Sequence, residues 1–299
     1  MNFGVWIPNC RHLATPDIIR RAAVRAEQLD YDSVWVSDHV VVPHANVVNF
    51  GETIFDPLVT LAVIAGATSR VRLGTTVLIV PYRNAVVTAK MISSLDALSG
   101  GRFVFGIGAG WVAAESAALG VPFAERGPMT DEYLNAMQEL WTKREPSFAG
   151  KYTQFNDIVF EPKPVQKPHP PIWVGGHSRA ALRRTAQFGA AWHPINRSPG
   201  ELRAGMSALA QICQARGRAV APALTARNDM RILRPGEQVP KSAHAGRVLA
   251  GEPAALVDQI TELAACGVEH LVLEFLAADG RELDEQMTIF AERVRPRIA

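Results

Sequence analysis

The stretch Val34-Trp35-Val36-Ser37-Asp38-His39 is the starting point for our interpretation of the fold. Its first three residues are apolar and predict a short buried β-strand, which ends abruptly on three polar side chains. In parallel α/β proteins, side chains at the carboxyl ends of the strands face the ligand crevice. There, Asp38 and His39 are candidates to hold, orient or exchange a proton with a polar ligand. The alternative is structural: Asp38 caps the following turn and His39 is a buried histidine with satisfied hydrogen bonds.

On both sides of this stretch, short apolar strands alternate with longer amphipathic segments. We predict strands at residues 3–7, 34–36, 71–78, 103–108, 172–174, 190–193, 224–233 and 270–275. Each is followed by a predicted helix, at residues 16–30, 56–68, 85–98, 130–143, 178–189, 199–216, 253–266 and 283–294. Strands that are apolar on both faces indicate a sheet buried on both sides. The pattern predicts an α/β fold, a (β/α)8 TIM-like barrel with insertions. A doubly wound sheet is the alternative, because the sequence does not say whether the sheet closes.

Three segments interrupt the alternation of strands and helices. Residues 40–52 form a polar loop that is long for a connection between a strand and a helix, which is typical of a functional lid. Residues 146–171 are rich in proline and aromatic residues and predict an extended insertion with one hairpin. Residues 234–251 show no clear periodicity. Since no segment has a linker-like composition, we predict a single domain over residues 1–299.

The composition argues against several classes of partner. Lys plus Arg is 31 and Asp plus Glu is 29, so the net charge of +2 implies neither nucleic acid nor an anionic membrane as a partner. Three cysteines lie far apart and form no metal-binding pattern, which favours free thiols in a reducing compartment. The N-terminal residues resemble a strand rather than a signal peptide, and no apolar run is long enough to span a bilayer. We therefore expect a cytoplasmic protein without a bound metal.

Two of the predicted strand ends are rich in glycine. The run Gly175-Gly176-His177-Ser178 opens onto a predicted helix, and its backbone N–H groups and the positive helix end suit a phosphate. Gly106, Gly108 and Gly110 alternate before Trp111, either for the close approach of a ligand or for tight packing at the strand end. The run is not a dinucleotide fingerprint, because the third glycine is missing at the required offset.

Three further groups of side chains have two interpretations each. The arginines of the helix after Gly176 suit either an anion site or a solvated face: Arg179, Arg183 and Arg184. Tryptophans near strand ends suit either core packing or a slot for a flat ring: Trp6, Trp111 and Trp192. Alternating charges of the strand at 224–233 form either a buried pair or an exposed stripe: Arg227, Asp229 and Arg231. Because no nucleophile elbow, P-loop or zinc motif is present, the sequence favours chemistry carried by a cofactor.

Taken in order, several stretches resemble the luciferase-like monooxygenase superfamily, and within it the branch of oxidoreductases that uses coenzyme F420. The stretches are residues 37–39, 73–77, 95–103, 106–111 with Glu115, and 171–176. The similarity runs from residue 3 to about residue 192 and resumes over about residues 251–273. Any one of these stretches is unspecific, whereas their order and spacing together are specific.

The resemblance implies a barrel that binds a deazaflavin and transfers a hydride between coenzyme F420 and a small organic substrate. Asp38 and His39 would lie near the ring, with His39 handling a proton or orienting the ring. Thr76 and Val77 would match the family's non-prolyl cis peptide, behind the ring. Backbone N–H groups would hold the ribityl chain and phosphate, from Gly108, Ala109, Gly110, Trp111, Gly175, Gly176 and His177. Family members are often dimers, so a homodimer is expected.

Two other functions fit the same scaffold. One is a monooxygenase that uses FMN and O2, because FMN binds to the same fold. The other is a cofactor-free barrel that serves as a binding or partner subunit. The chain departs from its relatives at Ala190-Ala191, where the family often has Asp-Gly, and at Ile195, where a sugar-phosphate dehydrogenase relative has a polar residue. These departures argue against a sugar phosphate as the substrate.

Overall fold

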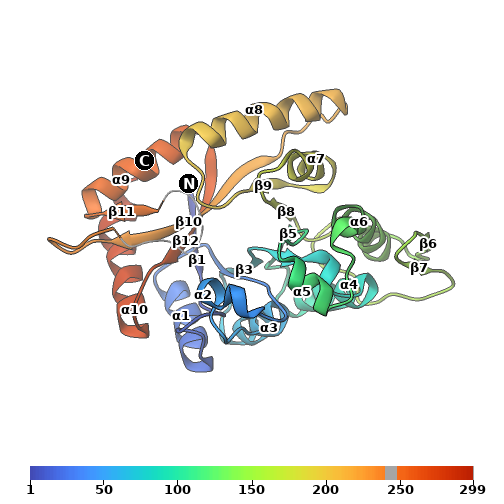
Figure 1. Cartoon of the computed structure of the whole chain (residues 1–299), viewed down its shortest axis with the longest axis horizontal. Coiled ribbons are helices and arrows are strands. Elements are labelled where there is room, and N and C mark those ends of the chain that lie inside the picture. The colour runs from blue at the N-terminus through green and yellow to red at the C-terminus, as the bar shows by residue number, and fades with distance from the viewer. Residues whose placement is uncertain (240–247, 299) are drawn as a thin grey trace.

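The computed structural model describes residues 1–239 and 248–298. Over these residues, eight parallel strands form a closed barrel (Figure 1). Around the barrel they are β1 (Asn2–Trp6), β2 (Ser33–Val36), β3 (Arg72–Thr75), β5 (Phe103–Gly108), β8 (Ile172–Gly175), β9 (Ala191–His193), β10 (Ala223–Ile232) and β12 (Val268–Phe275). Strand β9 pairs with β10, and β12 pairs with both β10 and β1, so the sheet closes. The (β/α)8 prediction is confirmed, and the doubly wound alternative is wrong.

A helix follows each barrel strand: α1 (Pro16–Gln28), α3 (Pro57–Ala67), α4 (Ala85–Leu98), α6 (Arg126–Thr142), α7 (Arg179–Phe188), α8 (Pro199–Ala215), α9 (Pro253–Ala265) and α10 (Gly280–Ile289). Side-chain caps fix several of the starts. Thr15 accepts a hydrogen bond from the Ile18 N–H, and Ser198 and Glu201 form a capping box at α8; each cap contributes about 1 kcal/mol. Helix α6 begins at Arg126 rather than at the predicted residue 130, because a proline is tolerated in the first turn of a helix.

Short elements lie where the sequence predicted irregular chain. The predicted polar loop at residues 40–52 contains two short helical elements, η1 (His44–Asn46) and α2 (Val47–Phe50). Strand β11 (Leu249–Gly251) pairs with β10, which corrects the prediction for the end of the 234–251 stretch; residues 240–247 lie outside the described residues. Elements this short leave no periodic signal in a sequence. The other short elements outside the insertion are β4 (Leu78–Ile79), η2 (Val80–Tyr82), α5 (Ala113–Ala118), η3 (Phe123–Glu125), η4 (Phe290–Val294) and η5 (Arg295–Arg297).

The predicted hairpin of the 146–171 insertion is confirmed. Strands β6 (Phe148–Ala149) and β7 (Gln154–Phe155) pair antiparallel and project at the right-hand edge of the molecule (Figure 1). Glu132 of α6 anchors the turn, because its carboxylate accepts hydrogen bonds from the backbone N–H groups of Tyr152 and Thr153, at 2.6 and 2.9 Å. The insertion is therefore tied to the helix layer.

The interior of the barrel combines aromatic and polar side chains. Trp35 stacks on Trp173, with ring centroids 4.8 Å apart, and lies against His193 and His270. The His270 Nε2 is 2.8 Å from the Ser33 Oγ. Burial lowers the pKa of both imidazoles to about 3, so they are neutral. The expectation of strands apolar on both faces is therefore wrong on the inner face, where hydrogen bonds satisfy the polar groups.

None of the described helices has the length and apolar character needed to cross a membrane. The three cysteines are free thiols. Within the described ranges, no group of three or more histidine, cysteine or acidic side chains is arranged to hold a metal ion.

Candidate active site

A cavity of about 610 Å³ lies at the carboxyl ends of the barrel strands. Cofactor and small-molecule sites are typically about 300–1,000 Å³ in volume. All the residues predicted for the site line this cavity: Asp38, His39, Thr76, Val77, Gly108, Ala109, Gly110, Trp111, Gly175, Gly176 and His177. Another cavity, of about 640 Å³, lies between α1 and α10 and is lined by none of them. We therefore place the candidate site at the strand ends, where the polar groups from different loops converge.

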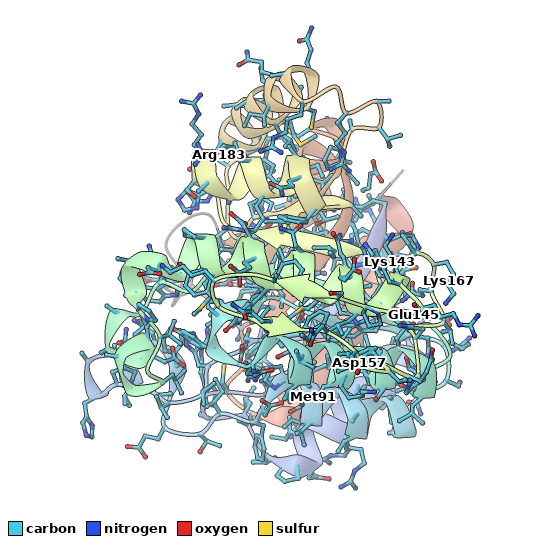
Figure 2. The ribbon with its side chains drawn as sticks, turned by 90° about the vertical axis from the view of Figure 1, so that its right-hand side faces the viewer. Met91, Lys143, Glu145, Asp157, Lys167 and Arg183 are labelled. Atoms are coloured by element: carbon cyan, nitrogen blue, oxygen red, sulfur yellow. The ribbon has the colours of Figure 1, made fainter. Side chains whose placement is uncertain are left out.

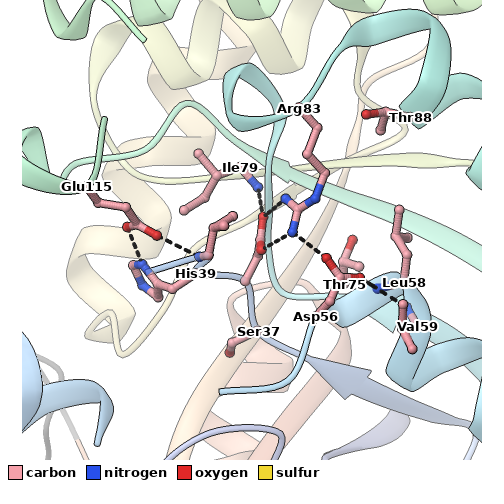
Figure 3. Close-up of polar contacts among 12 residues, drawn as sticks. Ser37, His39, Asp56, Leu58, Val59, Thr75, Ile79, Arg83, Thr88 and Glu115 are labelled. Atoms are coloured by element: carbon pink, nitrogen blue, oxygen red, sulfur yellow. Dashed lines mark hydrogen bonds and ion pairs between the residues drawn. The ribbon is translucent and has the colours of Figure 1, made fainter. Parts of the chain in front are cut away.

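His39 is paired with Glu115 rather than with its neighbour Asp38. The His39 Nδ1 lies 2.7 Å from the Glu115 Oε2, and the other carboxylate oxygen accepts from the Val40 N–H at 2.7 Å (Figure 3). Glu115 is fully buried and comes from α5, the short helix that the sequence did not predict. The carboxylate fixes a proton on Nδ1, which leaves Nε2 as an acceptor. Among the described residues, Nε2 has no hydrogen-bond partner, so a ligand in the cavity can use it.

Asp38 is held by a different set of contacts. Its carboxylate accepts two hydrogen bonds from the Arg83 guanidinium, at 2.7 and 2.8 Å, and one from the Ile79 N–H at 2.8 Å. Arg83 also reaches Asp56, the N-cap of α3, at 2.7 Å (Figure 3). Burial lowers the pKa of Arg83, but its hydrogen bonds to Asp38 outweigh burial and raise it overall. Asp38 and His39 therefore have separate partners, since Asp38 forms an ion pair with Arg83 and His39 lies against Glu115. Asp38 still lines the cavity.

The expected bulge forms one wall of the cavity. The peptide bond between Thr76 and Val77 is cis, as the resemblance implied. The Val77 side chain lies against Gly108 and Gly175; a Cβ at either glycine would come within 2.7 or 2.8 Å of a Val77 methyl group. These two glycines are therefore required by packing against Val77. On its other side, the Thr76 Oγ1 is 3.0 Å from the His193 Nε2.

One end of the cavity is suited to an anion. Gly176 has φ +87°, and Ser178 caps α7 by accepting from the Ala181 N–H at 3.2 Å. Arg184 and Arg126 line the same end; Arg184 is 93% buried and pairs with Asp131 at 2.6 Å. A solvated face was one interpretation of the arginines of this helix, and for Arg184 that interpretation is wrong.

The neighbouring arginines differ from Arg184 in exposure. Arg179 and Arg183 are exposed, and Figure 2 shows Arg183 on the outer surface of α7. Arg126, which donates to the Gly110 carbonyl at 3.1 Å, had no signal in the sequence analysis. It precedes the predicted start of the helix at residue 130, and its closeness to the glycine turns depends on tertiary structure.

The three tryptophans do not form a common slot. Trp111 lines the cavity and is 60% exposed, whereas Trp6 and Trp192 are buried and do not line it. The Trp192 Nε1 donates to the Gly176 carbonyl at 2.7 Å, so this ring supports the glycine turn from behind. The core-packing interpretation holds for Trp6 and Trp192.

Two of the three charged residues on β10 are buried, and one of them, Arg227, lines the cavity. Arg227 is almost fully buried and pairs with Glu274 of β12, which also pairs with Arg11. Asp229 is buried beside them, so the interpretation as an exposed stripe is wrong for Arg227 and Asp229. Burial raises the pKa of Cys10, which lines the same end of the cavity, to about 11. Its thiol therefore stays protonated near neutral pH, which argues against a nucleophilic role.

Arg231, the third of these charges, is partly buried. It pairs with Glu237 and Glu282 at 2.6 and 2.7 Å, away from Arg227. The alternating charged residues of this strand therefore belong to two separate groups of ion pairs.

A parallel (β/α)8 barrel with a cavity at the carboxyl ends of its strands has the arrangement in which TIM-barrel proteins place their functional sites. The chain belongs to the luciferase-like monooxygenase family, whose family model matches residues 1–227.

Two relatives are similar in sequence to part of this chain. The uncharacterized protein Rv0953c of Mycobacterium tuberculosis (strain ATCC 25618 / H37Rv) is 42% identical over 120 residues, which cover 40% of this chain and 42% of that protein. The FMNH2-dependent dimethylsulfone monooxygenase of Pseudomonas putida is 36% identical over 118 residues, covering 38% of this chain and 32% of that enzyme. The chain thus matches less than half the length of these relatives.

Solved structures share the whole fold. Monooxygenase RslO1 of Streptomyces bottropensis superposes with a TM-score of 0.86 at 20% identity, and the match covers both chains completely. An F420-dependent secondary alcohol dehydrogenase gives 0.82 at 18% identity, covering 100% of this chain and 99% of that one. Identities this low establish the fold alone. The solved structures with this fold include both F420-dependent enzymes and an FMN-containing monooxygenase.

Proposed function

We propose that the protein is an oxidoreductase that transfers a hydride between the deazaflavin coenzyme F420 and a small organic substrate. The observation that carries this proposal is the His39–Glu115 pair, a buried imidazole held by a carboxylate at the edge of the cavity. Oxidation of an alcohol removes a hydride from carbon and a proton from oxygen, and the reverse reaction returns both. A carboxylate-held histidine is suited to the proton transfer.

The two ends of the cavity suit the two parts of a flavin-like cofactor, its ring and its phosphate. Val77, packed on Gly108 and Gly175, forms an uncharged wall suited to a flat ring. The turn at Gly176 and the buried Arg184 are suited to the phosphate, because backbone N–H groups at a helix start and a guanidinium both donate to anions. When bound there, the deazaflavin supplies a ring carbon that gives or accepts the hydride.

The protein's own groups then have separate roles. The His39 Nε2 takes the proton from a substrate hydroxyl group, or returns it to a carbonyl oxygen. Glu115 keeps the imidazole in the required tautomer and stabilises its protonated form. Asp38, fixed by Arg83, holds the Ile79 backbone and so positions the wall rather than exchanging protons.

A fluorescence titration tests the cofactor. The purified protein should quench the fluorescence of coenzyme F420 and saturate with a Kd below about 10 µM. The absence of binding at tens of micromolar would refute the proposal. The Gly176→Val variant is the matched control, because its altered turn should weaken binding of the phosphate.

An FMN-dependent monooxygenase is the second candidate, and its support is the similarity to the dimethylsulfone monooxygenase. Flavin absorbance that copurifies with the protein, or oxygen uptake with reduced FMN, would favour it. The open glycine turns count against a cofactor-free partner subunit, since side chains do not fill the cavity.

We also propose that the enzyme is a homodimer. Val59 and Val63 on α3 and Val87 on α4 are uncharged and more than half exposed, and the two helices pack side by side. Mass by light scattering at several concentrations tests this, and a strictly monomeric mass would contradict it.

A further inference from the structure

The segment formed by η1 and α2 (residues 44–50), here called the lid segment, reaches the cavity at its last residue. Its last residue, Phe50, is buried and lines the cavity. The Phe50 ring packs on His39, with centroids 3.9 Å apart, and meets the edge of Trp111 at 5.9 Å. The position of the lid segment therefore sets what surrounds the imidazole.

Arg11, which follows β1, holds the end of this segment. Its backbone N–H donates to the Phe50 and Thr53 carbonyls, each at 3.1 Å, and its side-chain Nε donates to the Asn49 carbonyl at 2.9 Å. Gly51 makes this approach possible, since a Cβ there would lie 2.6 Å from the Arg11 Cα. Arg11 itself has φ +68°, a conformation that non-glycine residues rarely adopt and that often marks a functional constraint.

The guanidinium of Arg11 contacts the buried charged side chains of the barrel. Its Nη1 pairs with Glu274, whose other oxygen pairs with Arg227. Arg227 donates to the Thr76 carbonyl at 2.9 Å and to the Ser37 Oγ at 3.0 Å. A continuous set of contacts thus joins the lid segment to the wall at Thr76-Val77.

We propose that Arg11 is a positioning residue that holds the lid segment against His39. Its bonds to Asn49 and Phe50 fix the segment, and its ion pair with Glu274 fixes Arg11. The consequence for turnover rests on the proposed function, whereas the consequence for the lid segment does not. Loss of Arg11 opens residues 44–55 locally without unfolding the barrel.

Hydrogen exchange, followed by mass spectrometry, tests the holding role. In Arg11→Met, peptides covering residues 44–55 should exchange about tenfold faster, the effect expected for loss of one charge-assisted hydrogen bond. Peptides from the barrel strands should not change. The matched control is Arg20→Met, which removes an exposed arginine of α1. Unchanged exchange in residues 44–55 would overturn the proposal, as would equal acceleration over the whole chain.

A conservative variant separates the lid contacts from the ion pair. Arg11→Lys keeps a positive charge for Glu274 but has no group equivalent to Nε. We expect a Tm near the wild type with exchange of residues 44–55 still accelerated. Full restoration of slow exchange by lysine would show that charge alone matters and would refute the role. This variant also decides the question if Arg11→Met fails to fold.

Kinetics with coenzyme F420 give a second readout. Arg11→Met and Phe50→Ala should each lower kcat about tenfold, and the double variant should not fall further, because both act through Phe50. The Kd for F420 should stay within about twofold, since Arg11 follows β1 and Arg184 lies on the helix after β8, on opposite sides of the barrel. Additive losses in the double variant would overturn the proposal. If the wild type does not bind F420, the proposed function fails, and the exchange data still test Arg11.

Discussion

Glu115→Gln removes one negative charge from the candidate site while keeping the shape of the side chain. Two hydrogen bonds decide how the new amide is oriented. The carboxylate oxygen that faces Val40 accepts from a backbone N–H at 2.7 Å, so the amide oxygen must take that place. The amide NH2 group then faces the His39 Nδ1, 2.7 Å away. Since both amide hydrogens are donors, Nδ1 must become the acceptor, and the imidazole proton moves to Nε2.

The size of the expected effect follows from this change of tautomer. A protonated Nε2 cannot take a proton from a substrate hydroxyl group. General acid–base catalysis typically contributes a factor of about 10² to 10⁴, which corresponds to about 3–5 kcal/mol in activation free energy. We therefore expect kcat to fall at least about 100-fold. The Kd for coenzyme F420 should stay within about twofold, because Glu115 does not line the cavity.

Two measurements check this prediction. Nitrogen NMR of the imidazole should report a proton on Nδ1 in the wild type and on Nε2 in Glu115→Gln, and it needs no substrate. The rate of hydride transfer with any accepted alcohol or ketone gives kcat. Glu132→Gln is the control, since that carboxylate also holds backbone N–H groups but does so at the hairpin. An unchanged tautomer, or a kcat within about threefold of the wild type, would refute our reasoning.

Other predictions concern the proton-handling group, the phosphate end, the ion pair and the barrel interior. His39→Ala should lower kcat by at least about 100-fold with little change in F420 affinity, and parallel losses in both would show that His39 merely lines the ring. Gly176→Val should weaken F420 binding about tenfold or more by calorimetry with kcat at saturation nearly unchanged, because a β-branched residue is strained at φ +87°. Arg83→Met should lower the free energy of unfolding by about 3–5 kcal/mol in urea titrations, because it leaves the Asp38 carboxylate buried without its partner; a loss below about 1 kcal/mol would contradict this. His193 and His270 have folded-state pKa values of about 3, below the unfolded value of 6.5, so the unfolded chain binds more protons as the pH falls below 6.5. Stability should fall by about 1.4 kcal/mol per histidine for each pH unit between 6 and 3, and a flat urea midpoint over that range would show that these imidazoles are not neutral.

The sequence was informative about the barrel because its signals are local and repeated. Each strand is a short apolar run, and caps such as Thr15 and Ser198 mark the starts of helices. The strand ends also indicated which end of the barrel the candidate residues share, since side chains at the carboxyl ends of parallel strands converge. That is why the predicted residues from Asp38 to His177 line one cavity.

The partners of these residues were less predictable. His39 pairs with Glu115, which lies 76 positions along the chain, and Asp38 pairs with Arg83. Adjacent residues at the end of a strand need not share a partner, because successive side chains point in different directions. Glu115 was visible in the sequence as part of a family-like stretch, but its contact with His39 depends on the short helix α5.

Arg11 and Arg126 gave no signal, because Arg11 lies in a loop and Arg126 precedes the predicted start of its helix. Arg11 follows a strand, where a positive φ is not encoded by the residue type, and its partner Glu274 is on the last strand. Arg184 was recognised as one of three arginines on a helix, yet the pattern did not tell a buried arginine from the exposed Arg183. In each case the role comes from tertiary contacts.

A competition experiment between the two cofactors tests the central claim most directly. The protein would be saturated with coenzyme F420 and titrated with FMN while the fluorescence of released F420 is followed. Our proposal predicts that FMN releases F420 only at a concentration well above that of the deazaflavin. Release of F420 by FMN at or below an equal concentration would contradict the proposal and identify the protein as a flavin enzyme.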